Sequence, residues 1–124
     1  MQTVLAVLAI LAAGAQHAPS LAAAGHGDPT PLTVTGEILD MACYVAHGGR
    51  GPQHAKCALK CARQGQPIGL LASDGKLYLL FADHADGTAF NKAKELAGRN
   101  VEIRGEAAGR DGVNGLTVHA VEPR

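Results

Sequence analysis

The stretch IGLLASDGKLYLLF, residues 68–81, decides the fold. Two apolar runs, residues 68–72 and 76–81, flank the tripeptide Ser73-Asp74-Gly75. The Asp-Gly pair readily adopts the positive φ angles of a tight turn, so this pattern predicts an antiparallel β-hairpin. We therefore expect the rest of the domain to be built around this pair of strands.

Three further segments alternate apolar and polar residues with the period of a half-buried strand: residues 32–39, 100–107 and 116–122. Gly36 interrupts the first of them, and a glycine inside a strand often marks a sharp bend. Residues 89–97 have helical spacing instead, with Thr88 as the expected N-cap and Gly98 as the stop signal. The sequence therefore predicts a mainly β fold with one or two short helices. The order of the elements resembles the OB-fold, a five-stranded Greek-key barrel, and the alternative is a generic α+β sandwich.

An insert between the first two predicted strands, residues 40–66, holds all three cysteines of the chain. It begins with Asp40 and Cys43 and continues through a Gly-rich loop at residues 48–52. A proline near the start and a glycine beyond the end frame residues 53–63 as a helix. The insert is therefore expected to carry the chemistry of the protein.

Three donor residues of this predicted helix, His54, Cys57 and Cys61, lie on one side of it, within an arc of roughly 60°. Their stripe borders an apolar face formed by Ala55, Ala58, Leu59 and Ala62. Cys43 can fold back onto the stripe and complete a set of three thiols and one imidazole. Such a set suits tetrahedral Zn(II), or Cu(I) with some of its members, because thiolates are soft ligands. We therefore predict a metal site formed by Cys43, His54, Cys57 and Cys61.

A disulfide is the alternative use of the same cysteines. In an exported protein Cys43 can be oxidised to Cys57 or Cys61, which would fasten the insert to the sheet and leave one thiol free. The protein would then be a disulfide-stabilised binding or interaction module without metal. A thiol redox enzyme is disfavoured, because such enzymes use a C-x-x-C pair at the start of a helix.

Other polar residues receive simpler interpretations. Asp40 is expected to cap the local turn rather than to orient a ligand imidazole. His47, in the Gly-rich region, is expected to be solvated rather than to serve as a fifth donor. His84 and His119 have no partner in the sequence pattern, and we assign them no role.

The N-terminal segment differs from the rest of the chain, since no charged side chain precedes Asp28. Residues 4–13 form an apolar run of about ten residues, which fits a signal-peptide core and is too short to span a bilayer. The small residues 22–24 predict cleavage after Ala24, with Ala15 as an alternative site. We therefore expect a signal peptide over residues 1–24, a flexible leader over 25–31 and a domain over 32–124. The protein is expected to be exported, periplasmic or secreted, with no stable membrane anchor.

The charge balance and the remaining motifs limit the classes of function. Eleven basic and eleven acidic residues balance, and no basic cluster is present, which disfavours a nucleic-acid partner. No Ser/His/Asp series, phosphate-binding glycine loop or dinucleotide fingerprint can be assembled, so we expect no enzymatic activity. The expected partner is a metal ion, Cu(I) or Zn(II), and another exported protein is a further candidate.

The insert also resembles a group of small exported bacterial proteins of uncharacterised function. They share D-x-x-C-Y, a Gly-containing spacer, H-x-x-C-A-x-x-C-A and G-x-P-x-G. In this sequence the motif residues are Asp40, Cys43, Tyr44, His54, Cys57, Ala58, Cys61, Ala62, Gly65, Pro67 and Gly69. The resemblance implies a shared site on an OB-like barrel without naming its chemistry.

Overall fold

The computed structural model describes residues 27–124, in which five strands and three helices follow one another. The strands are β1 (Gly27–Asp40), β2 (Ile68–Ala72), β3 (Leu77–Ala82), β4 (Asn100–Arg110) and β5 (Val113–Pro123). The helices are α1 (Met41–His47), α2 (Ala55–Arg63) and α3 (Thr88–Glu95). The predicted signal peptide, with its cleavage sites at Ala24 and Ala15, lies outside the described residues.

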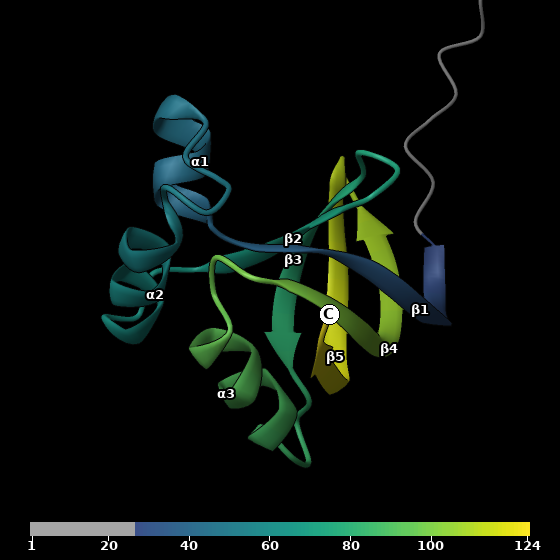
Figure 1. Cartoon of the computed structure of the whole chain (residues 1–124). Helices are drawn as coiled ribbons and strands as arrows, with labels where there is room; N and C mark the ends of the chain where they lie inside the picture. Colours follow the sequence, from purple (N-terminus) through teal and green to yellow (C-terminus); the bar gives the residue numbers. More distant parts are fainter. Residues whose placement is uncertain (1–26) are drawn as a thin grey trace, which may run out of the picture.

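The strands form one mixed sheet that closes into a ring, in the order β1-β2-β3-β5-β4, with β4 paired back to β1 (Figure 1). β2 and β3 pair antiparallel, with Leu70 opposite Tyr78, so the predicted hairpin is confirmed. β3 and β5 form the parallel pair, and the remaining neighbours are antiparallel. The expectation of a mainly β fold with five strands is therefore confirmed.

Three strands are longer than their sequence patterns predict. β1 begins at Gly27 rather than residue 32, and residues 27–31, expected to be a flexible leader, lie along β4 with Pro31 opposite Glu106. β4 and β5 extend toward each other until Arg110 pairs with Val113. Positive φ angles at the two residues between them, 51° and 85°, make the tight turn. The added parts of the three strands lack a regular apolar periodicity because their side chains are largely exposed. Their backbones nevertheless remain paired.

Gly36 is the point at which β1 passes from one neighbour to the other. Residues before Gly36 pair with β4, and residues after Glu37 pair with β2. Gly36 and Glu37 pair with both strands, and Gly36 lies opposite Ala72 and Val101. A Cβ atom at this position would overlap the backbone carbonyl of Leu71. The predicted interruption of the strand at this glycine therefore lies where β1 exchanges one neighbour for the other and the backbone of β2 approaches closely.

The core fills the inside of this ring and extends under the helices. Its largest fully buried side chains include Ile38, Leu70, Ile103 and Leu116. α2 contributes Ala58 and Ala62, and α3 contributes Ala93. Figure 1 shows α1 and α2 together at one side of the strands, with α3 below α2. α2 and α3 thus bury small alanine side chains, which allow close packing against the core.

The start of α3 corrects one expectation. Thr88 is the first residue of the helix, and Gly87 occupies the N-cap position that was assigned to Thr88. The Thr88 amide donates instead to Asp86 Oδ1 at 2.9 Å, so an aspartate outside the helix satisfies this terminal amide. The helix ends at Glu95, two residues before the expected residue 97.

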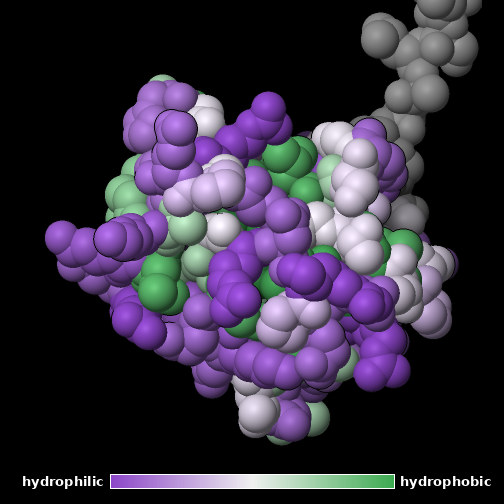
Figure 2. Space-filling model, viewed as in Figure 1, coloured by the Kyte–Doolittle hydropathy of each residue, from purple (hydrophilic) through white to green (hydrophobic). Residues whose placement is uncertain are grey.

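The surface is largely hydrophilic on the face shown in Figure 2, with small separate apolar patches. Among the described residues, the large apolar side chains that are exposed are Val45, Phe81 and Val113. Within residues 27–124, no helix is long and apolar enough to cross a membrane.

Candidate metal centre

The insert begins and ends at the same place on the sheet. Asp40, the last residue of β1, pairs with Ile68, the first residue of β2. The Met41 amide also donates to the Pro67 carbonyl at 3.0 Å, just beyond that pair. The two halves of the insert therefore leave and rejoin the sheet side by side, so that α1 and α2 can face each other.

α1 positions Cys43, and the sequence pattern did not predict this helix. Asp40 is its N-cap, with Oδ1 accepting a hydrogen bond from the Ala42 amide at 3.1 Å. Gly48 ends the helix with a φ of 72°, and its amide donates to the Tyr44 carbonyl at 2.8 Å. An Asp N-cap and a Gly C-cap are the usual helix boundary signals, so these two residues could have revealed α1. The interpretation of Asp40 as a local cap is confirmed.

The loop between α1 and α2 places His54 next to Cys43. Its Gly51 amide donates to Glu37 Oε1 of β1 at 2.6 Å, and its Gly49 amide donates to the Cys43 carbonyl at 3.3 Å. Gly49 also lies against the imidazole of His54, where an added Cβ atom would be 2.7 Å from Nε2. The loop is therefore tied to β1 and α1 and holds one face of the His54 ring.

α2 carries the two remaining cysteines. It begins at Ala55 rather than at residue 53, with His54 as its N-cap, and it buries Ala58 and Ala62 as expected. His54 has near-helical backbone angles, φ −95° and ψ −10°. Its side chain therefore projects as it would from a residue inside the helix. Cys57 is exposed and Cys61 is half-buried. The predicted border position of the stripe is thus observed.

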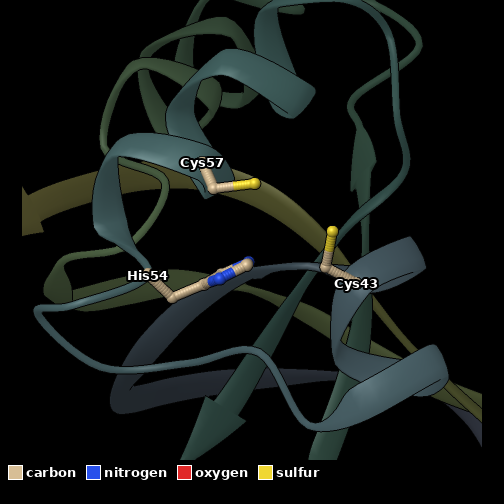
Figure 3. Close-up of side chains that lie close together, drawn as sticks. All are labelled: Cys43, His54 and Cys57. Carbon is tan, nitrogen blue, oxygen red and sulfur yellow. The ribbon is translucent and has the colours of Figure 1, made fainter.

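Two overlapping groups of donor atoms result. A ring nitrogen of His54 and the sulfurs of Cys43 and Cys57 lie within 4.8 Å of one another, and all three side chains point to a common centre (Figure 3). A carboxylate oxygen of Asp40 and the sulfurs of Cys43 and Cys61 form a second such group. The Cys57 and Cys61 sulfurs are 4.0 Å apart, and all three cysteines are free. The four predicted ligands are therefore divided between two groups that share Cys43.

Two thiols of this cluster, those of Cys43 and Cys61, hold their protons strongly. The neighbouring Asp40 carboxylate raises the pKa of Cys43 to about 12, because it stabilises a protonated thiol and repels a thiolate. Burial raises the pKa of Cys61, and the adjacent Cys57 thiol acts in the same direction. Burial also opposes ionisation of Asp40, but the Cys43 thiol and the Ala42 amide stabilise its charged form more strongly and lower the pKa of Asp40. A cation that binds here must therefore displace thiol protons.

Two buried polar atoms face this cluster without a partner. In the described part of the chain, Asp40 Oδ2 and His54 Nε2 are buried and make no hydrogen bond of acceptable geometry. A buried polar atom without a partner costs about 1–3 kcal/mol. Both residues belong to the donor groups, so a cation bound at the cluster would satisfy these atoms.

Two other histidines of the described residues, His47 and His119, belong to neither donor group. His47 is exposed and meets the His54 ring edge-on, with ring centroids 5.8 Å apart. His119, which the sequence pattern left without a role, has its Nε2 atom 3.0 Å from Asp83 Oδ2. This contact joins β5 to the segment after β3 and could not be found without knowing that these strands are parallel neighbours.

Comparisons of this chain with protein-family models, with curated proteins and with solved structures found no match.

Proposed function

We propose that this chain is an exported metal-binding protein that carries zinc or copper on Cys43, His54 and Cys57, with Cys61 as an additional thiolate. The observation that carries this proposal is the imidazole of His54, which has a ring nitrogen within 4.8 Å of two free thiols and a buried Nε2 atom without a hydrogen-bond partner. Buried imidazole nitrogens are normally hydrogen-bonded or bound to a metal. An ion at the centre of the three side chains provides the missing partner.

The donor types narrow the metal to two candidates. Two thiolates and one imidazole suit Zn(II), which prefers sulfur and nitrogen ligands, and also suit Cu(I), which prefers soft thiolates. Zinc needs a fourth ligand in most protein sites, and Cys61, whose sulfur is 4.0 Å from that of Cys57, is one candidate.

Exposure of the site favours a carrier over a purely structural role. Structural zinc sites are closed, whereas Cys57 is an exposed side chain on the outside of α2. Val45, two residues after Cys43 on α1, is 75% exposed. We propose that another exported protein approaches this side of α1 and α2 and exchanges the ion through Cys57.

The fold around the site is proposed to be an OB-like barrel. Three consecutive antiparallel strands, a parallel contact of β3 with β5, and closure of β4 on β1 agree with a five-stranded Greek-key barrel. The insert then connects the first two strands at one end of the barrel.

Export is proposed on the sequence alone. The uncharged N-terminal 27 residues, the apolar run over residues 4–13 and the small residues before Gly25 support a signal peptide that is removed after Ala24. We propose the periplasm or the extracellular space as the location.

Replacement of His54 by alanine tests the proposed site. We expect the affinity of the reduced protein for Zn(II) to fall by about 10- to 100-fold, because one ligand is lost while the buried face of α2 is unchanged. The control is His47→Ala, which removes the neighbouring exposed ring outside both donor groups. Competition with a chromophoric zinc chelator measures both affinities. Equal affinities of the two variants would contradict the role of His54.

A further inference from the structure

The second donor group, Asp40, Cys43 and Cys61, has an observation of its own that points to a ligand. Asp40 is fully buried, with a relative exposure of 0%, at the end of β1. Its Oδ1 atom caps α1, but its Oδ2 atom has no hydrogen-bond partner in residues 27–124. The thiols of Cys43 and Cys61 are the groups that interact with this carboxylate on the cluster side. The cap of α1 therefore accounts for the burial of one carboxylate oxygen of Asp40 and leaves Oδ2 without a partner.

Simple geometry separates this group from the first one. Ligand bonds to zinc are about 2.0–2.3 Å long, so two ligands of one ion are at most about 4.6 Å apart. The sulfurs of Cys57 and Cys61 are 4.0 Å apart and do not separate the two groups. The Asp40 carboxylate and the His54 ring do separate them, because they belong to different sets of close-lying donors. Cys43 alone belongs to both. With the side chains as they stand, two adjacent ion positions that share one sulfur use all five donors.

Charge balance also favours two divalent ions. When the three cysteines are bound as thiolates, they and the Asp40 carboxylate carry four negative charges in a partly buried cluster, and one Zn²⁺ neutralises only half of them. A second Zn²⁺ brings the formal charge of the cluster to zero, with His54 neutral. Uncompensated charge is costly away from water, so the second ion removes a large unfavourable contribution.

We propose that Asp40, Cys43 and Cys61 form a second, inner Zn(II) position, bridged to the outer position by the Cys43 thiolate. This inference rests on the proposed function and extends it from one ion to two. The inner position is selective for a zinc-like divalent ion, because a carboxylate oxygen is a common ligand of zinc and a poor ligand of Cu(I). The remaining coordination sites of each ion are open to water or to a donor of the receiving protein.

The stoichiometry of zinc binding tests this proposal. Native mass spectrometry of the reduced full chain, titrated with Zn(II) alone, is expected to show two ions per chain. Asp40→Asn should bind one ion, because asparagine keeps the N-cap hydrogen bond but loses the charged ligand oxygen. The matched control is Asp83→Asn, the same change at a carboxylate paired with His119 outside the cluster, and it should still bind two ions.

A second variant tests the inner position independently, so that the result does not depend on the folding of Asp40→Asn alone. Cys61→Ser removes another ligand of the inner group, and it is also expected to bind one ion. Wild-type protein that binds a single ion, or an Asp40→Asn or Cys61→Ser variant that still binds two, would overturn the inner position and leave the proposed function intact. Wild-type protein that binds neither Zn(II) nor Cu(I) would overturn both.

Discussion

Asp40 combines two roles that the sequence separates poorly. Its Oδ1 atom caps α1, and the other side of its carboxylate faces the thiols of Cys43 and Cys61. The same contact raises the pKa of Cys43 to about 12, so the Cys43 thiol of the metal-free protein is protonated at neutral pH. One buried aspartate therefore fixes the start of the insert and also sets the protonation of its thiols.

Metal binding is expected to strengthen as the pH rises. The pKa values of Cys43 and Cys61 are raised, so near neutral pH both thiols are protonated before the ion binds, and each proton must be released. Each released proton changes the apparent affinity by about tenfold per pH unit. Chelator competition between about pH 6 and about pH 8 measures the slope. An affinity for Zn(II) that is independent of pH in this range would show that these thiols are not ligands.

Sequence reasoning identifies cluster residues when they share one helix. His54, Cys57 and Cys61 follow the helical period, and α2 does bring their side chains to the border of its buried face. Asp40 was recognised as a cap but not as a donor. Its proximity to Cys61 depends on the burial of the end of β1 against α2, a tertiary contact that no local pattern contains.

At the scale of the elements, the loop between α1 and α2 determines whether His54 reaches the cluster. Gly51 is tied to Glu37 of β1, and Gly49 packs against the imidazole of His54. This loop was predicted as a Gly-rich spacer without a stated role. Its contacts show why small residues are needed there, because a side chain at Gly49 would occupy the place of the His54 ring.

Gly49→Ala is therefore expected to weaken metal binding with little loss of fold. The added methyl group would lie 2.7 Å from His54 Nε2, so the ring must shift from its present position beside the sulfurs of Cys43 and Cys57. We expect the affinity for Zn(II) to fall by roughly tenfold, somewhat less than for loss of the ligand itself. The control is Gly87→Ala, where the new Cβ atom is 3.8 Å from Ala82 Cβ, an ordinary contact.

Chelator competition and thermal unfolding of both glycine variants provide the measurement. An affinity of Gly49→Ala equal to that of Gly87→Ala would mean that the His54 ring is not held by the loop. The position of the loop in the site would then need revision.

For the molecule as a whole, closure of the sheet explains why the insert forms a compact site. Because Asp40 and Ile68 are paired on adjacent strands, residues 41–67 must leave and return at one point, and α1 and α2 are brought together there. The strands themselves were predictable from their periodicity and from the Asp-Gly turn. Ring closure was expected only from the resemblance of the element order to the OB-fold, since the β1–β4 and β3–β5 pairings join segments far apart in the sequence.

The central claim is that the three cysteines are thiolate ligands of a metal ion. Elemental analysis and thiol counting on one sample of the chain, purified under reducing conditions and then freed of reductant, test it most directly. We expect at least one equivalent of zinc or copper, with three thiols that become reactive only after a chelator removes the metal. Metal-free protein with a single reactive thiol and one disulfide between the other two cysteines would contradict the account and identify a disulfide-stabilised module instead.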